Sequence, residues 1–305
     1  MKSDFSVLIP ARGSCPYLSQ TLESICASSI QPKEVILVND GIDSSTLLEI
    51  SIFKQILPLT ILPNLGHGLV AALNTGLQHC KTDLIARLDA DDLVTQMRFQ
   101  LQLDAMASMP EVVLLGGQAT YIDSWGSVTG LSNYQPGRVD TNPRFLTECM
   151  VAHPAVMFRT LTAKSVGGYR SLCTDGRIDL AEDFDLWLRM KNLGEVYNLS
   201  QSILLYRQHA NQISSLHIST QSFATKYVSQ VHVAEIANPE FEFKQLKLAK
   251  WSLQFLKVSY GALAGIITFR RRFALIFEGL PIFFGLRNRS LLRILRKSAR
   301  LIAGN

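Results

Sequence analysis

The most informative stretch of the chain is Leu84-Ile-Ala-Arg-Leu-Asp-Ala-Asp-Asp92, in which a short apolar run leads directly into three carboxylates. The apolar part has the length and composition of a buried strand. Successive side chains of a strand point to opposite faces, so Asp89 and Asp91 can converge on one hard cation, which prefers oxygen ligands. An exposed acidic turn with a helix cap is the competing interpretation, because aspartate is common at both places.

Short apolar runs that end in polar residues recur along the chain and alternate with segments of helical periodicity. Strands are predicted at 5–9, 34–38, 59–62, 84–88, 112–121 and 203–206, and helices at 18–27, 44–53, 69–80, 96–109 and 182–191. We expect Pro10 to end the first strand, Ser44 and Ser45 to cap the second helix, and residues 123–143 to form a loop. This alternation is typical of an α/β sheet, in which ligands bind beyond the carboxyl ends of the strands.

The composition is that of a globular protein with a sizeable core. Of the 305 residues, 47% are hydrophobic and 18% are charged, which excludes a disordered chain. The five cysteines are an odd number and form no C-x-x-C pair, which argues against a disulfide framework and against a thiolate zinc site. The apolar stretch that follows Asp4 is too short for a secretory signal, so we expect a cytoplasmic protein.

Positive charge is concentrated in the last part of the chain. From Lys244 onward there are thirteen basic residues and one acidic residue, a formal charge of +12, which leaves −7 for the first 243 residues. We therefore predict one domain at 1–215 and a helical, basic and apolar C-terminal region at 216–305. The apolar runs of this region are shorter than the roughly 18 residues of a membrane span.

The end of this region, from Ser290 to Ile302, places apolar residues near one helical face and basic residues on the other. Such a helix is typical of a segment that lies on an anionic membrane, which would put the protein at the inner face of the cell membrane. A helical subdomain that packs on the rest of the chain with a solvated basic face is the alternative. We expect no nucleic-acid partner, because the sequence indicates no module in which aromatic and basic residues interleave.

A second acidic group is Glu182-Asp-Phe-Asp185, at the start of a predicted helix. Acids in a first turn are favoured by the helix dipole, so their presence alone does not indicate catalysis. Asp40, at the end of the second strand, likewise fits a simple turn in Asn39-Asp-Gly41. The informative observation is that all these segments occur together in one order.

The ordered segments span about residues 5–214, and they are Val7-Leu-Ile-Pro-Ala11, Glu34-Val-Ile-Leu-Val-Asn-Asp-Gly41, Asn64-Leu-Gly66, Leu73-Asn-Thr-Gly76, Ile85-Ala-Arg-Leu-Asp-Ala-Asp-Asp92, His153-Pro154, Gly167-Gly-Tyr169, Ala181 to Arg189, and Tyr206-Arg-Gln-His209. In this order they resemble the family 2 inverting glycosyltransferases of the GT-A, or nucleotide-diphospho-sugar transferase, fold. The resemblance implies an α/β protein with a mixed, mostly parallel sheet flanked by helices, and the helical, basic C-terminal tail lies outside it.

The resemblance also implies roles for the carboxylates. Asp40 would lie against the nucleobase, Asp89 near the ribose and the metal, and Asp91 on an Mn²⁺ or Mg²⁺ ion that bridges the diphosphate of the donor. Asp183 would be the general base that removes the proton of the acceptor hydroxyl as it attacks the anomeric carbon. The chemistry is consistent with the residues, because a metal offsets charge on the leaving nucleoside diphosphate and one carboxylate suffices for a single inverting displacement.

Four further residues are assigned less specifically. The resemblance places Pro10 and Arg12 at the nucleotide, although Ala11-Arg-Gly13 stands where a Tyr-Asn pair is common. Arg87 would neutralise the acidic cluster or approach the diphosphate, and a purely structural ion pair is equally compatible. His209 would complete the metal site, since imidazole can ligate Mn²⁺, or would simply be packed or solvated.

These observations predict a metal-dependent enzyme that moves a sugar from a nucleoside-diphosphate donor, first of all a UDP-sugar, to a hydroxyl of a glycan or lipid-linked acceptor in cell-surface polysaccharide synthesis. A catalytically silent sugar-nucleotide-binding protein, or a membrane-bound assembly partner of other transferases, is the alternative. Other nucleotide enzymes are disfavoured, because the sequence contains neither G-x-G-x-x-G nor a P-loop motif. The stretch Pro10-Ala-Arg-Gly-Ser14 is also too poor in glycine for the phosphate loop of a nucleotidyltransferase.

Overall fold

The computed structural model describes residues 4–174, 179–209 and 218–237. The chain divides into two compact units, Met1–Ser229 and Gln230–Asn305, and almost all of the described residues belong to the first. Most of the predicted basic and apolar region, including its amphipathic end at 290–302, lies outside the described residues, and the boundary after residue 215 stays a prediction. In the described part of the chain, no helix is long and apolar enough to span a bilayer.

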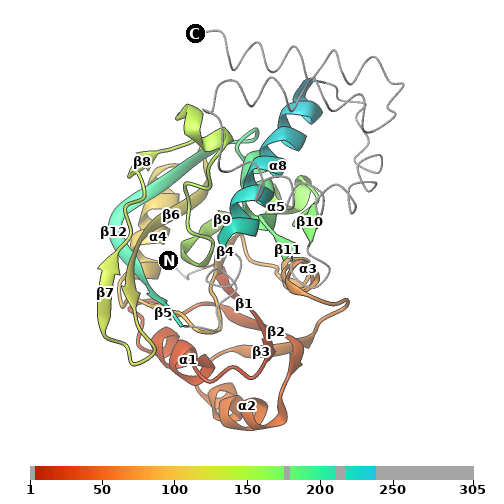
Figure 1. The fold of residues 1–305 in the computed structure, drawn as a ribbon. Coiled ribbons are helices and arrows are strands. Elements are labelled where there is room, and N and C mark those ends of the chain that lie inside the picture. Colours follow the sequence, from red (N-terminus) through yellow and green to blue (C-terminus); the bar gives the residue numbers. More distant parts are fainter. Residues whose placement is uncertain (1–3, 175–178, 210–217, 238–305) are drawn as a thin grey trace. The chain divides into compact units, whose positions relative to one another are not determined.

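The first unit is built around one mixed sheet, with the strand order β3-β2-β1-β4-β9-β6-β12-β5, β7 beside β6 and β8 beside β12 (Figure 1). The strands of this sheet are β1 (Phe5–Gly13), β2 (Glu34–Ile42), β3 (Leu59–Pro63), β4 (Leu84–Arg87), β5 (Leu93–Val94), β6 (Val112–Ile122), β7 (Val128–Leu131), β8 (Gly137–Arg138), β9 (Met157–Arg159) and β12 (Glu195–Arg207). The long ladders are parallel, and short antiparallel ladders of β9 join β4 to β6. The predicted fold class is therefore confirmed.

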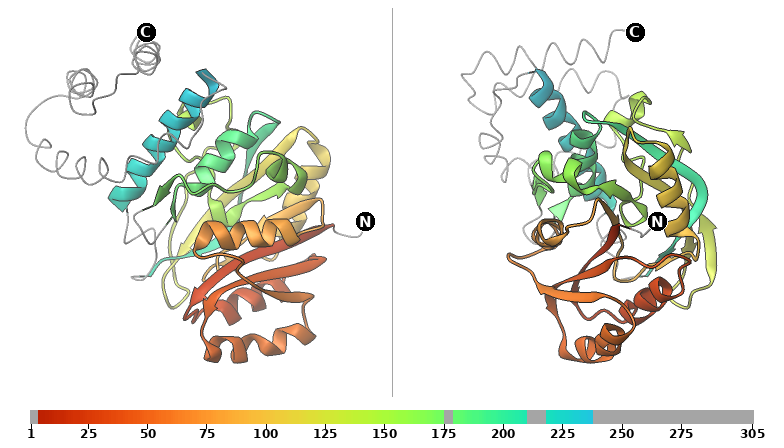
Figure 2. Two further views of the ribbon diagram at one scale, coloured as in Figure 1. Left: turned by 90° about the vertical axis from the view of Figure 1, so that its right-hand side faces the viewer. Right: turned by 180° about the vertical axis from the view of Figure 1, so that it is seen from behind.

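Helices cover both faces of the sheet around β1 (Figure 2). They are α1 (Leu18–Cys26), α2 (Ser44–Glu49), α3 (Leu69–His79), α4 (Arg98–Ser108), α5 (Thr160–Ser165), α6 (Glu182–Met190) and α8 (Ile218–Ala237), with the 3-10 turns η1 (Ile50–Gln55), η2 (Pro143–Leu146) and η3 (His153–Ala155). A two-stranded ribbon, β10 (Cys173–Thr174) with β11 (Asp179–Leu180), precedes α6. Val7 of β1 belongs to the same core cluster as Leu22 of α1, whereas its neighbour Leu8 packs with Leu73 of α3. The alternation of the strand therefore produces one core on each face.

The prediction that Pro10 ends the first strand is wrong. Pro10 lies within β1 and pairs with Val38 of β2. The carbonyl of Leu8 accepts a hydrogen bond from the amide of Leu88, so the backbone polar groups of Leu8 point toward β4. The backbone nitrogen of Pro10, two residues further on, points to the same side. Because β4 has already ended at that level, no ladder bond requires the amide hydrogen that proline lacks. β1 therefore extends past β4 toward the edge of the sheet at which ligands are expected to bind.

Three other predictions of local structure were wrong. The carboxylate of Asp43 caps α2, accepting the amide of Thr46 at 2.7 Å, in place of the hydroxyls of Ser44 or Ser45. The predicted loop 123–143 contains β7 and β8, and β12 begins at Glu195, eight residues before the predicted strand. The early part of β12 is rich in polar residues, which hid it from a search for apolar runs.

Candidate active site

The acidic stretch lies beyond the carboxyl end of β4. Asp89, Asp91 and Asp92 each bring one carboxylate oxygen to within 4.8 Å of the others. Asp89 and Asp91 are half-buried, whereas Asp92 is fully buried. We call these three residues the acidic triad. The two carboxylates that the sequence predicted to converge do so, and a third joins them.

Arg87, the last residue of β4, pairs with the first acid of the triad. Its Nη2 lies 2.5 Å from Oδ1 of Asp89. The guanidinium is buried, and its Nε and Nη1 have no hydrogen-bond partner among the described residues. Burial raises the pKa of Asp89, and the charge of Arg87 acts against that rise. The structure thus contains an ion pair between Arg87 and Asp89, which agrees with both the neutralising role and the purely structural one.

A second buried arginine, Arg207 at the end of β12, holds the backbone of the triad. Its amide donates to Oδ1 of Asp92 at 2.8 Å, and its Nε donates to the carbonyl oxygen of Asp91 at 3.0 Å. Nη2 donates to Oε1 of Gln20 in α1 at 2.8 Å, and Nη1 donates to the carbonyl oxygens of residues 123 and 124, where β6 turns toward β7. Arg207 thus connects the triad to α1 and to the β6–β7 hairpin.

His209 follows Arg207 by two residues and meets the triad from the same strand end. Its Nε2 lies 2.9 Å from Oδ2 of Asp91. The ring is half-buried beside Tyr17, the residue before α1, with ring centroids 5.5 Å apart. The structure therefore places His209 next to the triad, the position that the predicted role as a cation ligand needs.

The residues present fit a hard divalent cation. Carboxylate oxygens with one imidazole are ligands that suit Mg²⁺ or Mn²⁺. Oδ2 of Asp92 is buried and has no hydrogen-bond partner among the described residues, an arrangement that is costly unless a positive group offsets it. Burial, and after it the charges of Asp89 and Asp91, raise the pKa of Asp92 well above its usual range. A cation beside the triad would relieve this repulsion.

Asp183 stands in the first turn of α6, two residues after a strained backbone position. Ala181 has a φ of 57°, and among the described non-glycine residues it alone is left-handed. That conformation costs about 1–2 kcal/mol, and such strain is typical of functional sites. Oδ1 of Asp183 accepts the amide of Phe184 at 2.7 Å, while Oδ2 has, among the described residues, the Sγ of Cys149 at 3.8 Å as its one partner. Oδ2 is therefore open to accept a proton.

Asp183 and the triad lie in one electrostatic site. Burial raises the pKa of Asp183, and the amide of Phe184 and then the charge of Arg87 act against that rise. The charge of Asp183 in turn contributes to the raised pKa of Asp89. The predicted base and the predicted metal ligands are therefore close enough to influence one another.

The other acids of α6 have structural partners. Asp185 is buried between two arginines, with Nη2 of Arg170 at 2.5 Å from Oδ1 and Nη2 of Arg189 at 2.5 Å from Oδ2. Arg189 also donates to the carbonyl oxygens of Val166 and Gly168, and so ties α6 to the turn after α5. Asp185 is thereby occupied in holding α6 in place.

Glu182 belongs to a buried polar cluster behind the base. Nδ1 of His153 lies 3.6 Å from Oε1 of Glu182, and Nε2 of His153 lies 3.1 Å from the hydroxyl of Tyr169. Burial, and after it the charge of Arg87, lower the pKa of His153 well below its usual range, so the imidazole is neutral at neutral pH. His153 therefore helps to hold the first residue of α6 in position.

The residues predicted on the nucleotide side gather at the ends of β1 and β2. Asp40 accepts hydrogen bonds from Nδ2 of Asn64 at 2.8 Å and from the amide of Gly68 at 3.0 Å. Nε of Arg12 lies 3.8 Å from the same carboxylate, and the arginine side chain is 70% exposed. Pro10 is buried within β1. The structure thus brings Arg12 and Asp40 together within the carboxyl-terminal parts of β1 and β2.

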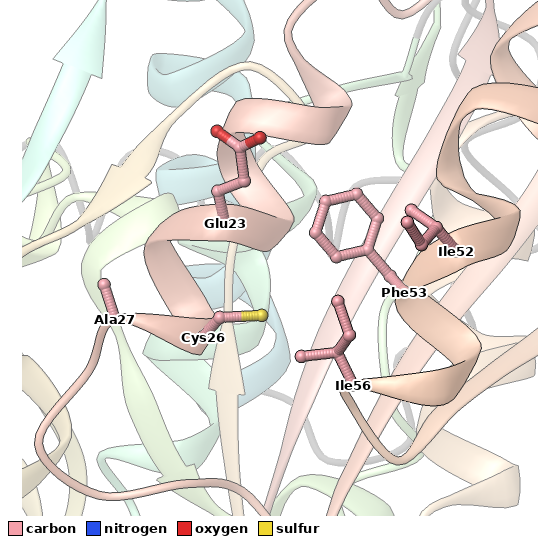
Figure 3. Close-up of a pocket in the computed structure, with 6 residues that line it drawn as sticks. All are labelled: Glu23, Cys26, Ala27, Ile52, Phe53 and Ile56. Atoms are coloured by element: carbon pink, nitrogen blue, oxygen red, sulfur yellow. The ribbon is translucent and has the colours of Figure 1, made fainter.

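A cavity of about 460 Å³ lies between α1 and η1 (Figure 3). Its lining consists of Glu23, Cys26, Ala27, Ile52, Phe53 and Ile56. The lining is mainly apolar and includes none of the predicted site residues. The cavity is therefore not part of the candidate active site.

The family model described as glycosyl transferase family 2 matches residues 6–164, which is just over half of the chain and includes the whole triad. The chain belongs to glycosyl transferase family 2. The resemblance drawn from the ordered segments is thereby confirmed for this glycosyltransferase.

Two relatives agree with this assignment. The glycosyltransferase is 33% identical over 202 residues to the amylovoran biosynthesis glycosyltransferase AmsE of Erwinia amylovora, an alignment that covers 65% of this chain and 73% of the relative. It is also 33% identical over 191 residues to the UDP-Gal:alpha-D-GlcNAc-diphosphoundecaprenol beta-1,3-galactosyltransferase of Escherichia coli, over 61% of this chain and 66% of the relative.

The fold has solved counterparts as well. The structure of S. aureus TarS 1-349 in complex with UDP-GlcNAc superposes with a TM-score of 0.61 at 18% identity, over 80% of this chain and 69% of that chain. This likeness agrees with the GT-A fold that the sequence predicted.

Sequence reasoning assigned no role to two residues that this glycosyltransferase places at the centre of its site. Asp92 was counted in the acidic stretch but not among the metal ligands, because alternation along a strand singles out Asp89 and Asp91. Arg207 was quoted within Tyr206-Arg-Gln-His209 without a function, since an arginine at a strand end is usually solvated. Its signal was its position directly after the apolar end of β12.

We expect Arg207→Met to raise the Mn²⁺ concentration that half-activates the glycosyltransferase by about 10- to 100-fold, the usual effect of losing a group that orients metal ligands. Without the guanidinium, the carbonyl of Asp91 and the β6–β7 turn lose their common donor. Arg207→Lys should retain only part of the wild-type affinity for Mn²⁺, because an ammonium cannot make the several hydrogen bonds of the planar guanidinium. Arg144→Met, at an exposed arginine paired with Glu148, is the control, and an unchanged Mn²⁺ titration in the Arg207 variants would contradict the prediction.

Proposed function

We propose that this glycosyltransferase transfers a sugar from a nucleoside-diphosphate donor, most directly a UDP-sugar, to a hydroxyl of a glycan or lipid-linked acceptor, with inversion at the anomeric carbon. The observation that carries the proposal is the acidic triad in one electrostatic site with Asp183. The names of the relatives support the setting, since one belongs to amylovoran biosynthesis and another names UDP-Gal and a GlcNAc-diphosphoundecaprenol. We infer that this chain also acts in the synthesis of a cell-surface polysaccharide.

In the proposed mechanism, the triad and His209 would hold a divalent cation, Mn²⁺ or Mg²⁺, which supplies positive charge against the diphosphate as it leaves. Oδ2 of Asp183 accepts the proton of the acceptor hydroxyl. The hydroxyl oxygen forms a bond to the anomeric carbon of the donor while the bond from that carbon to the diphosphate oxygen breaks. One such displacement inverts the anomeric carbon and needs no covalent intermediate. Arg87, paired with Asp89, favours the ionised form of that carboxylate.

The nucleotide side is proposed to be the edge formed by Pro10, Arg12 and Asp40. Asp40 is oriented by Asn64 and by the amide of Gly68, so its position is fixed before a ligand arrives. Arg12 is largely exposed, and its guanidinium is available to a phosphate or a base edge. These contacts would orient the donor while the triad faces its diphosphate.

A catalytically silent nucleotide-sugar-binding protein is the second candidate, and a donor panel separates the two. Purified full-length protein is incubated with several UDP-, GDP- and dTDP-sugars, with and without Mn²⁺, and release of nucleoside diphosphate is measured. We expect release from a UDP-sugar that depends on the cation. Binding of a UDP-sugar without any release, in the presence of membrane extract as a source of acceptor, would favour the silent protein.

We further propose that the basic region after Lys244 attaches the enzyme to an anionic membrane surface. Its support is the charge of +12 alone. Each basic residue near such a surface contributes about 1 kcal/mol, so several together give firm binding that salt weakens. The full chain should co-sediment with phosphatidylglycerol vesicles at low salt, and a chain truncated after residue 243 should not. Failure of the full chain to sediment would contradict the proposal.

A further inference from the structure

Three half-buried tyrosines, Tyr121, Tyr134 and Tyr206, take no part in the mechanism above, and Tyr134 lies close enough to the other two and to Asp183 to be influenced by their charges. Tyr121 of β6 and Tyr206 of β12 are paired in register, and their rings meet edge to face with centroids 5.9 Å apart. Tyr134 follows β7, and after burial the charges of Cys149, both other tyrosines and Asp183 raise its pKa. We call the three residues the tyrosine shelf.

Tyr134 is held rigidly by Gln118 of β6. The side-chain Nε2 of Gln118 donates to the carbonyl oxygen of Tyr134 at 2.9 Å, and its Oε1 accepts the amide of Tyr134 at 3.0 Å. The Tyr134 hydroxyl, in contrast, has no hydrogen-bond partner among the described residues. A fixed backbone with an available hydroxyl is favourable for ligand binding, because little conformational entropy remains to be lost.

A buried amide connects this part of the shelf to the proposed base. Nδ2 of Asn198 in β12 donates to the carbonyl oxygen of Gln135 at 3.1 Å and to that of Met150 at 2.8 Å. These carbonyls belong to the neighbours in sequence of Tyr134 and of Cys149. The thiol of Cys149 in turn lies 3.8 Å from the carboxylate of the proposed base. The spacing between the shelf and the base is therefore set by hydrogen bonds in the interior.

The chain segment that contains Tyr134 carries no charged side chain. Residues 124–137 include no Lys, Arg, His, Asp or Glu. A phosphate or carboxylate group would find no positive partner in this segment, whereas aromatic faces and a phenolic hydroxyl suit the C–H face and the hydroxyls of a neutral sugar. We propose that the tyrosine shelf binds the neutral sugar ring of the acceptor whose hydroxyl reacts, with Tyr134 as the residue that positions it. This inference rests on the proposed function.

The test uses methyl glycosides of neutral hexoses and N-acetylhexosamines as probes, with methyl glucuronide as the charged comparison. Binding to the full-length protein, in the presence of UDP and Mn²⁺, is measured by saturation-transfer difference NMR. We expect at least one neutral glycoside to bind and methyl glucuronide to bind at least tenfold more weakly. Tyr134→Ala should weaken the neutral probe tenfold or more, and Tyr134→Phe should weaken it two- to fivefold.

Tyr197→Ala is the matched control, because Tyr197 is a half-buried tyrosine near the opposite end of β12 and should leave glycoside binding unchanged. Tyr134→Leu replaces the alanine variant if that variant unfolds, since it keeps apolar volume and removes the ring and the hydroxyl. Wild-type binding of no neutral glycoside, or equal binding by the Tyr134 variants, would overturn the inference. UDP binding, measured separately by calorimetry, distinguishes this result from failure of the proposed function, which predicts that UDP binds in every variant.

Discussion

Asp91→Asn is expected to lower sugar transfer about a hundredfold or more, while the protein remains folded. A neutral amide cannot replace a carboxylate opposite a hard divalent ion, and such an ion contributes several kcal/mol against the charge of a leaving group. Asp91 is half-buried and lies 2.9 Å from His209, so its loss removes charge from the triad without emptying a core position. Release of nucleoside diphosphate, titrated with Mn²⁺, measures the effect.

Asp83→Asn is the matched control for this experiment. Asp83 is an exposed carboxylate at the opposite end of β4, where it precedes the strand instead of following it. The control should retain wild-type transfer and the wild-type response to Mn²⁺. Full cation-dependent activity in Asp91→Asn would remove Asp91 from the proposed ligand set.

Asp183→Asn is expected to lower turnover by roughly 10²- to 10⁴-fold, the usual range for loss of a general base, and to leave the affinity for UDP unchanged. Asparagine preserves the shape of the side chain and removes its ability to accept a proton. The variant is compared with Asp185→Asn, whose carboxylate bridges Arg170 and Arg189. That second variant should lose about 3–5 kcal/mol of folding free energy, because it removes the buried negative charge that both arginines share. A loss of UDP affinity in Asp183→Asn equal to its loss of turnover would assign Asp183 to nucleotide binding.

The pH profile gives an independent measure of the same role. Asp183 must be ionised to accept a proton, and burial raises its pKa. The wild-type rate should therefore fall on acidification through a pH above the ordinary value for aspartate, about 3.9. The residual activity of Asp183→Asn should lack this step, as measured by transfer rates in buffers of constant ionic strength.

The order of apolar runs and acidic turns predicts the sheet around β1 well, because each of these strands is short, apolar and bounded by a turn. Predictions failed where local pattern and tertiary context disagree. Pro10 is tolerated inside β1 because the neighbouring strand ends first, and the polar half of β12 is a strand because β6 pairs with it along its length. Neither condition can be read from the residues of the segment itself.

The site shows the same division. The three acids after β4 and Asp183 are apparent in the sequence, since their spacing and order carry the information. Arg207 and Asn198 are not, because each acts by donating to backbone groups that are distant in sequence. Bonds of this kind depend on which loops the fold brings together, and a single sequence does not contain that information.

The pairing of β12 with β6 also determines where the length of this chain can change. Side chains alternate along a strand, so one residue inserted between Leu204 and Arg207 would turn Arg207 and His209 together to the opposite face. The triad would then lose the hydrogen bonds of Arg207 and the imidazole of His209 together. An insertion at Gly126, in the exposed β6–β7 turn, moves none of these groups. Insertions and deletions should therefore accumulate at the hairpin tip and be absent from the end of β12.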